Sequence, residues 1–222
     1  MEKDFVFISD THCKHSSLVL PEGDTIIHCG DVSSIGSITE IKKFSEWFGN
    51  LPYENKIMIP GNHDFAFEKY PEESSEIIKE KNIICLINQG IEVYGLKIWG
   101  SPITPYFRNW AFNRFRGSEI QSYWDRIPDD TDILITHGPP AYLKNLSFVL
   151  GGEDVGCEDL YNTIKKRVKP KISSFGHIHE GYGIHQDEET IFINCSLLNT
   201  RYELVNDPFK IRYKEGKFFI TE

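Results

Sequence analysis

The sequence has few cysteines, and they are scattered along the chain. The five cysteines are odd in number and include no Cys-x-x-Cys pair: Cys13, Cys29, Cys85, Cys157 and Cys195. This pattern argues against a disulfide framework and against a thiolate zinc site, and it favours a reducing compartment. No basic N-terminal region leads into a long apolar stretch with a cleavage site, so no secretory signal is expected. We therefore expect a cytoplasmic protein.

Long apolar runs and an excess of positive charge are also missing. No run approaches the ~18 residues that a membrane span needs. Lys and Arg number 24 against 33 Asp and Glu, which gives a formal net charge of −9. Duplex nucleic acid and anionic membranes are bound through clustered Lys and Arg, so neither partner is expected. A phosphate substrate is not excluded, because bound metal ions can make a local site positive.

What the 222 residues do contain is an alternation of short apolar runs and amphipathic segments, without repeats or linkers, which indicates one domain over 1–222. The β-branched runs predict buried strands at 5–8, 25–28, 56–59, 132–135 and 171–174. Apolar residues at helical spacing predict helices at 38–48, 118–127 and 158–168, with Ser37 and Glu40 as a capping box and Ser118 as a second cap. Turn residues predict hairpins at 91–99, 182–194 and 209–220. Together these patterns favour a layered α/β fold with mixed sheets.

Five short polar motifs each follow a predicted strand. They are Asp10-Thr11-His12, Gly30-Asp31, Gly61-Asn62-His63-Asp64, His137-Gly138-Pro139-Pro140 and Gly176-His177-Ile178-His179. Because ligand sites in open α/β sheets gather beyond the carboxyl ends of strands, we expect these loops to converge on one site. The glycines that open three of the motifs fit tight turns, which would let the backbone approach that site.

The motifs supply seven side chains of the kind that Mn, Fe, Co and Zn accept as ligands. These candidate metal ligands are Asp10, His12, Asp31, Asn62, His137, His177 and His179. Residues at i and i+2 of an extended loop point the same way, so two of the motifs can act as pincers. Seven donors exceed the needs of one tetrahedral ion, whereas two ions that share a carboxylate would use them all. A two-metal centre, with a bridging hydroxide attacking phosphorus, is the economical hypothesis.

His63 is the one motif histidine that this centre does not need as a ligand. It stands between Asn62 and Asp64, and we expect the Asp64 carboxylate to orient it. Its predicted role is that of a general acid that protonates the leaving alkoxide. Outside the motifs, His15, His28 and His185 are interpreted as structural residues, although His28 could support the site and His15 could line its entrance.

The five motifs in this order, across residues 10 to 179, resemble the calcineurin-like metallophosphoesterase superfamily. The stretch from Trp99 through Trp110 and Arg116 to Pro140 is further similar to the metallophosphoesterase-domain-containing (MPPED-like) branch. The resemblance implies an αββα sandwich of the metallo-dependent phosphatase type, with two divalent ions at the strand ends, Mn favoured and Fe, Zn or Co as alternatives. It places one ion on Asp10, His12, Asp31 and His179, and the other on Asp31, Asn62, His137 and His177. Asp31 would be the bridge.

Two contrasts within the superfamily narrow the activity. Phosphoprotein phosphatases carry Gly-Asp-x-x-Asp-Arg-Gly and Gly-Asn-His-Glu, but this chain has Ser34 and Asp64 at the corresponding positions. This difference argues against protein dephosphorylation. Some vertebrate members of the MPPED-like branch replace a metal-site histidine with glycine and lose activity. Both His177 and His179 are present here, so an active enzyme is favoured.

Three segments outside the motifs have two interpretations each. Residues 106–116 are either core with a solvated basic face or a substrate segment, in which Arg108, Asn113 or Arg114 contacts phosphate and an aromatic ring stacks on a nucleobase. The same alternatives hold for Asn199 and Arg201, which follow a strand that could return to the site. Residues 151–154 are either an ordinary surface loop or a lid beside the His137 motif.

The leading hypothesis is a dinuclear metal-dependent phosphodiesterase that acts on small phosphoesters, cyclic-nucleotide-like ones included. A nuclease or a phosphomonoesterase could use the same centre. In a hypothesis of another class, the chain is a scaffold that binds nucleotide or a protein partner with little turnover. The sequence leaves the oligomeric state open.

Overall fold

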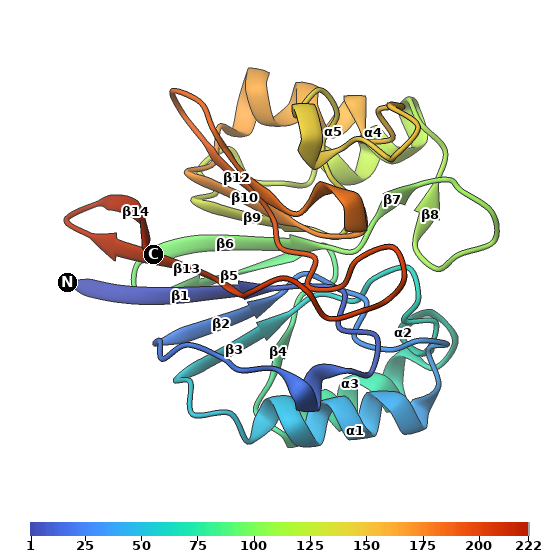
Figure 1. The fold of residues 1–222 in the computed structure, drawn as a ribbon. Helices are drawn as coiled ribbons and strands as arrows, with labels where there is room; N and C mark the ends of the chain where they lie inside the picture. The colour runs from blue at the N-terminus through green and yellow to red at the C-terminus, as the bar shows by residue number, and fades with distance from the viewer. Residues whose placement is uncertain (222) are drawn as a thin grey trace.

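The computed structural model describes residues 1–221, and two six-stranded sheets face each other at its centre (Figure 1). The first sheet has the order β14 (Lys217–Thr221), β13 (Phe209–Lys214), β1 (Glu2–Ile8), β2 (Thr25–His28), β3 (Asn55–Met58) and β4 (Ile84–Cys85). The second has the order β11 (Gly183–Gln186), β12 (Ile191–Asn194), β10 (Ile172–Phe175), β9 (Ile133–Thr136), β6 (Leu96–Ser101) and β5 (Gln89–Val93).

Helices cover the outer faces of both sheets (Figure 1). Helices α1 (Ile38–Gly49) and α3 (Pro71–Glu80) cover the first sheet, and α4 (Ser118–Trp124) and α5 (Glu158–Thr163) cover the second. Shorter elements are α2 (Ala66–Lys69) and the two-stranded pair β7 (Thr104–Pro105) and β8 (Asn113–Arg114). The expected αββα order of layers is confirmed. Among residues 1–221, no helix combines the length and the apolar character needed to cross a bilayer.

The period-two pattern of β1 explains why two sheets stack here. Phe5 and Phe7 point into an apolar layer between the sheets, whereas Val6 and Ile8 belong to the layer that packs on Phe44 of α1. Side chains alternate along a strand, so a strand that is apolar on both faces is stable only when both faces are covered. All four residues are fully buried.

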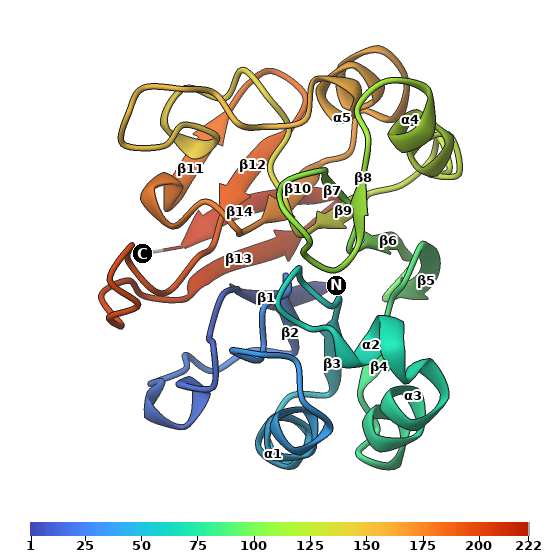
Figure 2. The same ribbon diagram turned by 90° about the vertical axis from the view of Figure 1, so that its right-hand side faces the viewer.

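The strand directions decide where the polar motifs meet. Strands β1 to β4 run parallel to one another, as do β6, β9, β10 and β12. In each sheet the carboxyl ends of these strands therefore lie at one edge, and Figure 2 looks onto the face where the loops of both sheets come together. An isolated bridge between Ser9 and Ser196 joins the loops that follow β1 and β12.

The structure departs from the sequence predictions mainly in the helices. The capping box of α1 is confirmed: Ser37 Oγ accepts from Glu40 N, and Ser37 N donates to Glu40 Oε2. Ser118 is not a cap, because it is already the first helical residue and Gly117 precedes it without a side-chain bond. The helix predicted over 158–168 is α-helical only as far as Thr163, and Ile164–Val168 form a π-helical turn. Helix α3 was not predicted, since only Ser74, Ile77 and Ile78 are buried in a charged segment.

Candidate metal centre

The motif side chains converge at the shared edge of the two sheets. Their potential ligand atoms form three groups, and within each group all of these atoms lie within 4.8 Å of one another. The groups are Asp10, His12 and His179; His12, Asp31 and His63; and Asp31, His137 and His177. The amide ligand predicted at Asn62 lies against the third group, with its Oδ1 2.8 Å from His137 Nε2. All seven predicted ligands are thus brought together.

Backbone carbonyls fix the orientation of the histidine rings. Nδ1 lies 3.1 Å from Ser33 O in His12, 2.8 Å from Cys29 O in His137 and 2.9 Å from Leu198 O in His179. A carbonyl oxygen only accepts, so each Nδ1 carries a hydrogen, and Nε2 is the ring atom that faces the carboxylates of the centre. Metal-binding histidines are oriented in this way, by donating their other ring N–H to a carbonyl or carboxylate.

Two observations test whether divalent ions fit these residues. The Nε2 atom of His12 is buried and has no hydrogen-bond partner among residues 1–221, which is costly unless another group binds there. Burial lowers the pKa of His137, but the Asp31 carboxylate outweighs this and raises it to about 10. Without metal, a proton on His137 balances the charge of the buried Asp31 carboxylate, whose Oδ2 lies 3.3 Å from His137 Nε2. A bound metal cation could balance the same charge. Both observations fit a cation site.

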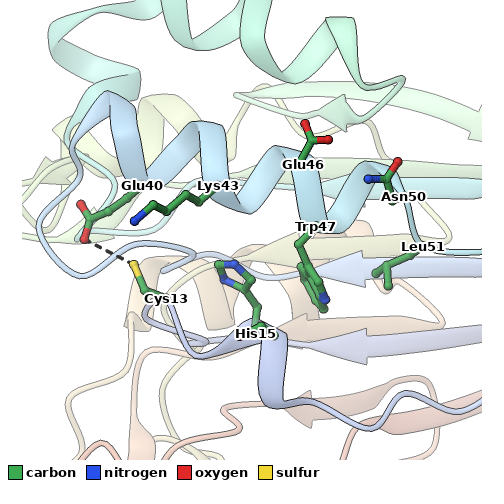
Figure 3. Close-up of a pocket in the computed structure, with 9 residues that line it drawn as sticks. Cys13, His15, Glu40, Lys43, Glu46, Trp47, Asn50 and Leu51 are labelled. Atoms are coloured by element: carbon green, nitrogen blue, oxygen red, sulfur yellow. Dashed lines mark hydrogen bonds between the residues drawn. The ribbon is translucent and has the colours of Figure 1, made fainter.

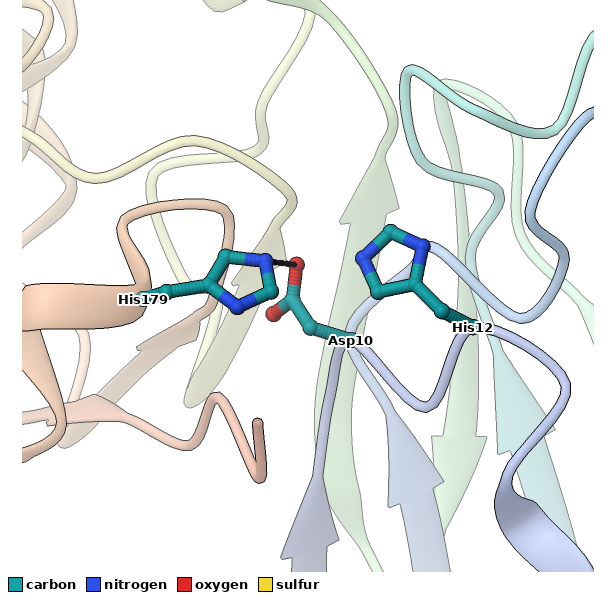
Figure 4. Close-up of side chains that lie close together, drawn as sticks. All are labelled: Asp10, His12 and His179. Carbon is teal, nitrogen blue, oxygen red and sulfur yellow. Dashed lines mark ion pairs between the residues drawn. The ribbon is translucent and has the colours of Figure 1, made fainter. Parts of the chain in front are cut away.

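The electrostatics favour ionised carboxylates at Asp10 and Asp31 and a neutral imidazole at His177. Burial acts to raise the pKa of Asp10 and Asp31, but the facing histidines lower it by more. The pKa of each carboxyl group therefore stays below its ordinary value. Burial lowers the pKa of His177 to about 4, with the His137 charge acting in the same direction. Figure 4 shows the position of one of these carboxylates, with Asp10 between His12 and His179 and its Oδ1 3.7 Å from His179 Nε2. These protonation states are those that metal coordination requires.

The backbone of the centre is strained. Four of the predicted ligands have left-handed backbone angles, with φ of 55° at Asp10, 38° at His12, 57° at Asp31 and 69° at His177. Residues with a Cβ adopt this region at a cost, and such residues cluster at functional sites. No sequence pattern pointed to this feature, because the motif residues concerned are not glycines.

Close backbone approach explains two of the motif glycines. A Cβ on Gly61 would lie 2.2 Å from Asp31 Oδ1, and one on Gly176 would lie 2.0 Å from Asp10 Oδ2. A Cβ would also lie 2.3 Å from Asp31 N at Gly61 and 2.1 Å from Ser9 Oγ at Gly176, so a side chain at either position would displace the neighbouring loop as well as the carboxylate. The turns at Gly61 and Gly176 are therefore close to the centre, as expected, because their backbones lie directly against the carboxylates of Asp31 and Asp10.

Comparison with known proteins identifies the family. Residues 4–181 match the model of the calcineurin-like phosphoesterase family. This chain belongs to that family. It is 40% identical to human metallophosphoesterase domain-containing protein 1, over 93% of this chain and 70% of the relative. It is 37% identical to the UPF0046 protein C25E10.12 of Caenorhabditis elegans, over 96% of this chain and 82% of that protein. The predicted MPPED-like resemblance is confirmed.

Solved structures support the fold at much lower identity. A putative 5′-nucleotidase from Staphylococcus aureus has a TM-score of 0.60 and 15% identity, and the match covers all of this chain and 53% of that chain. The TT1561 protein of Thermus thermophilus has a TM-score of 0.59 and 13% identity, with 87% and 89% of the two chains covered. Family membership and the clustered ligands together indicate a metal-dependent phosphoesterase.

In this phosphoesterase centre, His63 is held by its own contacts. Its Nδ1 lies 2.8 Å from Ser34 O, and its ring stacks on Trp110 with centroids 4.2 Å apart and planes at 29°. Its backbone N–H donates to Asp31 Oδ1 at 2.8 Å. The ring is therefore fixed on two sides with Nε2 left free, and Trp110 is a contact that the sequence motifs did not reveal.

The expected role of Asp64 in orienting His63 is corrected by the structure. The fully buried Asp64 carboxylate accepts hydrogen bonds from the backbone N–H groups of Val32, Ser33 and Gly61, and from the Ser33 hydroxyl. Burial raises its pKa to about 6, with the Asp31 charge acting in the same direction. Asp64 thus ties the Asp31 loop to the Asn62 loop, and the Ser34 carbonyl takes the position on the His63 ring.

Glu40 connects the cap of α1 to the same loops. Its Oε1 accepts from Cys13 Sγ at 3.3 Å (Figure 3). The same oxygen accepts from Ser34 N at 3.2 Å, while Oε2 completes the capping box. The carbonyls of Ser33 and Ser34 orient His12 and His63, so Glu40 steadies both rings indirectly. No motif pointed to this residue beyond its place in the capping box.

Two of the predicted substrate residues, Asn113 and Arg114, have hydrogen-bond partners within the protein. Asn113 Nδ2 donates to Phe107 O at 3.0 Å and to Arg108 O at 3.2 Å. Arg114 donates from Nε to Tyr123 Oη at 2.8 Å and from Nη1 to Asn113 O at 2.6 Å. Arg108 is exposed, with its guanidinium 5.2 Å from the Phe107 ring. These contacts shape the loop between β7 and β8, and phosphate contact by the three residues stays a prediction.

The loop after β12 returns to the centre, as the position of Asn199 and Arg201 suggested. The carbonyls of Leu198 and Asn199 face His179 Nδ1, and the nearby Tyr202 ring lies 4.9 Å from His12 and 5.2 Å from His179. Tyr202 therefore covers two ligand histidines from the solvent side. Its distance of more than twenty residues from the last motif kept it out of the sequence prediction.

The remaining histidines lie outside the ligand groups. His28 is fully buried, accepts from Gly30 N at Nδ1 and contacts Thr11 Oγ1 at 3.0 Å with Nε2, so it braces two motif loops. His15 faces a separate hollow of about 830 Å³ beside Trp47, which contains none of the seven candidate ligands (Figure 3). This hollow is therefore not the metal centre.

Proposed function

We propose that this chain is a two-metal phosphodiesterase that hydrolyses small phosphoesters, nucleotides among them. The observation that carries the proposal is the position of Asp31, which belongs to two of the three ligand groups. Its Oδ2 lies 3.6 Å from His12 Nε2 and 3.3 Å from His137 Nε2, so one carboxylate oxygen faces ligands of both expected ions. A shared carboxylate is what a two-ion centre needs.

Each group of residues then has a defined task. Asp10, His12, Asp31 and His179 would hold one ion, and Asp31, Asn62, His137 and His177 the other. When bound, two divalent ions supply an activated water and neutralise the charge of the phosphoryl oxygens. Mn is the favoured metal, with Fe, Zn or Co as alternatives that accept the same nitrogen and oxygen donors.

His63 is proposed to protonate the leaving oxygen. His63 belongs to the group with His12 and Asp31, so it would approach a phosphate bound at the centre from the side of the Asp31 ligand set. The Ser34 carbonyl and the Trp110 ring hold the imidazole in that orientation. General acid catalysis of this kind contributes roughly 10²–10⁴-fold to a rate.

The test is metal removal and reconstitution. Purified protein is stripped with a chelator, reloaded with Mn²⁺, Zn²⁺, Fe²⁺ or Co²⁺, and assayed on a chromogenic phosphodiester and a chromogenic monoester. We expect activity to disappear on stripping, to return with metal, and to be lost in Asp31→Ala. The control is Asp129→Ala, whose side chain is 75% exposed. Full activity in the stripped protein or in Asp31→Ala would refute the proposal.

The same assay separates the alternatives. Faster turnover of the monoester would assign a phosphomonoesterase, and cleavage of single-stranded oligonucleotides would assign a nuclease. Tight binding of a nucleoside monophosphate without hydrolysis of any ester would assign a binding scaffold.

The five free thiols support a reducing, cytoplasmic setting as part of the proposal.

A further inference from the structure

A cavity of about 300 Å³ opens directly beside the metal centre. Its inner wall is formed by Gly138, Ile178 and the candidate ligand His177, and its outer wall by Tyr106 and Phe107. The remaining wall comes from the loop that contains Val149, Glu153, Asp154 and Val155. The volume lies at the lower end of the range for small-molecule sites, so the cavity suits one compact organic group.

The outer wall presents two aromatic rings to solvent on a braced loop. Tyr106 is 49% exposed and Phe107 is 58% exposed, although burial of such rings is strongly favoured. Tyr106 N donates to Arg114 O at 2.8 Å, its ring stacks on Phe115 at 4.7 Å, and Asn113 holds the Phe107 carbonyl. Exposed aromatic side chains on a loop held this firmly are positioned for a ligand with an apolar face.

The opposite loop combines a fixed backbone with one unused carboxylate. Arg116 donates to Gly156 O at 2.7 Å and to Val155 O at 3.0 Å, which anchors the loop to the aromatic segment. Both Asp154 oxygens accept backbone N–H groups, from Tyr142 and Gly156. The Glu153 carboxylate has no hydrogen-bond or ion-pair partner within residues 1–221, so it is free to accept from a ligand.

We infer that this cavity holds the organic group of the phosphoester, and that the group is a flat ring with N–H donors, such as a nucleobase. The inference rests on the proposed phosphodiesterase function. A base would stack on the exposed aromatic rings and donate to Glu153, while its phosphate reaches the metal centre next to His177. The Glu153 charge repels a further phosphate, so esters with a single phosphate are favoured over polyphosphates.

The test compares two esters with the same leaving group. Thymidine 5′-(p-nitrophenyl phosphate) carries a base, and methyl p-nitrophenyl phosphate does not, so the ratio of their kcat/KM values reports the contribution of the base. We expect the Mn²⁺-loaded protein to prefer the thymidine ester roughly tenfold or more, since stacking and hydrogen bonding of one base favour binding by about 5-fold to 100-fold. Phe107→Ala and Glu153→Gln should each lower the ratio at least about fivefold.

Matched controls are Phe219→Ala and Glu92→Gln. Phe219 is a similarly exposed aromatic residue on β14, and Glu92 lies on β5; neither lines the cavity. Both controls should keep the wild-type ratio. Thermal unfolding of each variant shows whether the fold is retained, which is expected because Phe107 and Glu153 are exposed.

The outcomes are distinguishable. If neither ester is hydrolysed by the wild-type protein, the proposed function fails, and calorimetric titration with thymidine 5′-monophosphate and methyl phosphate still tests the cavity. The nucleotide must then bind more tightly, and Phe107→Ala must reduce the difference. An unchanged ratio in Phe107→Ala and Glu153→Gln overturns the inference. Tighter binding of phosphocholine than of the nucleotide overturns the assignment of a flat ring.

Discussion

The Trp110→Ala substitution tests whether the stacked ring positions His63, the proposed general acid. Trp110 lies 4.2 Å from the His63 ring at 29°, and Ser34 O fixes the Nδ1 of the same imidazole. An aromatic pair contributes about 0.5–1.5 kcal/mol beyond burial. Its loss should therefore reduce the population of the productive ring orientation roughly 2-fold to 12-fold. The general acid would be impaired by that factor, without loss of the metal ligands.

The assay measures kcat for methyl phosphates of a series of substituted phenols. A good leaving group such as p-nitrophenolate needs little protonation, whereas a poor one depends on the acid. We expect Trp110→Ala to lose about 2-fold to 12-fold with the poorest phenols and almost nothing with p-nitrophenol, which steepens the dependence on leaving-group pKa. Trp110→Phe should restore most of the wild-type slope, because a ring remains to stack.

A second tryptophan supplies the control. Trp47 packs on His15 with ring centroids 4.9 Å apart and planes tilted by 34°, so Trp47→Ala removes another Trp–His contact away from the centre. It should leave the leaving-group dependence as in the wild type. An equal loss for all phenols in Trp110→Ala, or no loss for the poorest, would refute the reasoning that Trp110 positions the acid.

Three further predictions concern the loops, the cap and the pH dependence. Gly61→Ala should weaken Mn²⁺ binding at least about tenfold in calorimetric titration, because its Cβ would lie 2.2 Å from a ligand oxygen, whereas Gly151→Ala, with nothing within 4 Å, should bind normally. Glu40→Ala and Ser37→Ala should each lower the free energy of unfolding in urea by about 1 kcal/mol, because each removes part of the cap of α1. Only Glu40→Ala should also lower kcat, because Glu40, unlike Ser37, binds the Ser34 loop. Equal kcat values in the two variants would contradict this link to the loops. Burial lowers the pKa of His15 to about 4 in the folded chain, so the unfolded chain binds the extra proton and the free energy of unfolding falls as the pH drops from 6.5 towards 4. His15→Phe should remove roughly 2 kcal/mol of the stability loss between pH 7.5 and 4.5, measured in the presence of chelator. An unchanged pH dependence of stability in His15→Phe would exclude this cause.

The position of the centre was predictable because it depends on the topology of the sheets. Once Asp10, Asp31 and His137 are placed after parallel strands, the strand ends bring them together whatever the rest of the chain does. Their donor atoms then limit the chemistry. Local patterns also predicted most strands to within a few residues, since buried strands leave short apolar runs in the sequence.

The supporting contacts were not predictable, because they depend on where side chains point. Asp64 is next to His63 in the sequence, but its carboxylate turns inward to the N–H groups of another loop. Trp110 and Tyr202 reach the histidines across dozens of residues, and nothing in the sequence pattern records such contacts. The sequence drew attention to the aromatic segment, yet only the structure shows that Asn113 and Arg114 shape the loop while Phe107 lines the cavity.

The left-handed backbone at Asp10, His12, Asp31 and His177 has a consequence for how such a chain drifts under mutation. Glycine is the residue that these four backbone conformations favour, so replacing a ligand by glycine relieves strain at the same moment as it removes a donor. A gene copy released from selection for catalysis would therefore find its stabilising substitutions within the motifs themselves. In this chain all four positions carry metal-ligand candidates in place of glycine, so the donors of the centre come with a local cost in backbone strain.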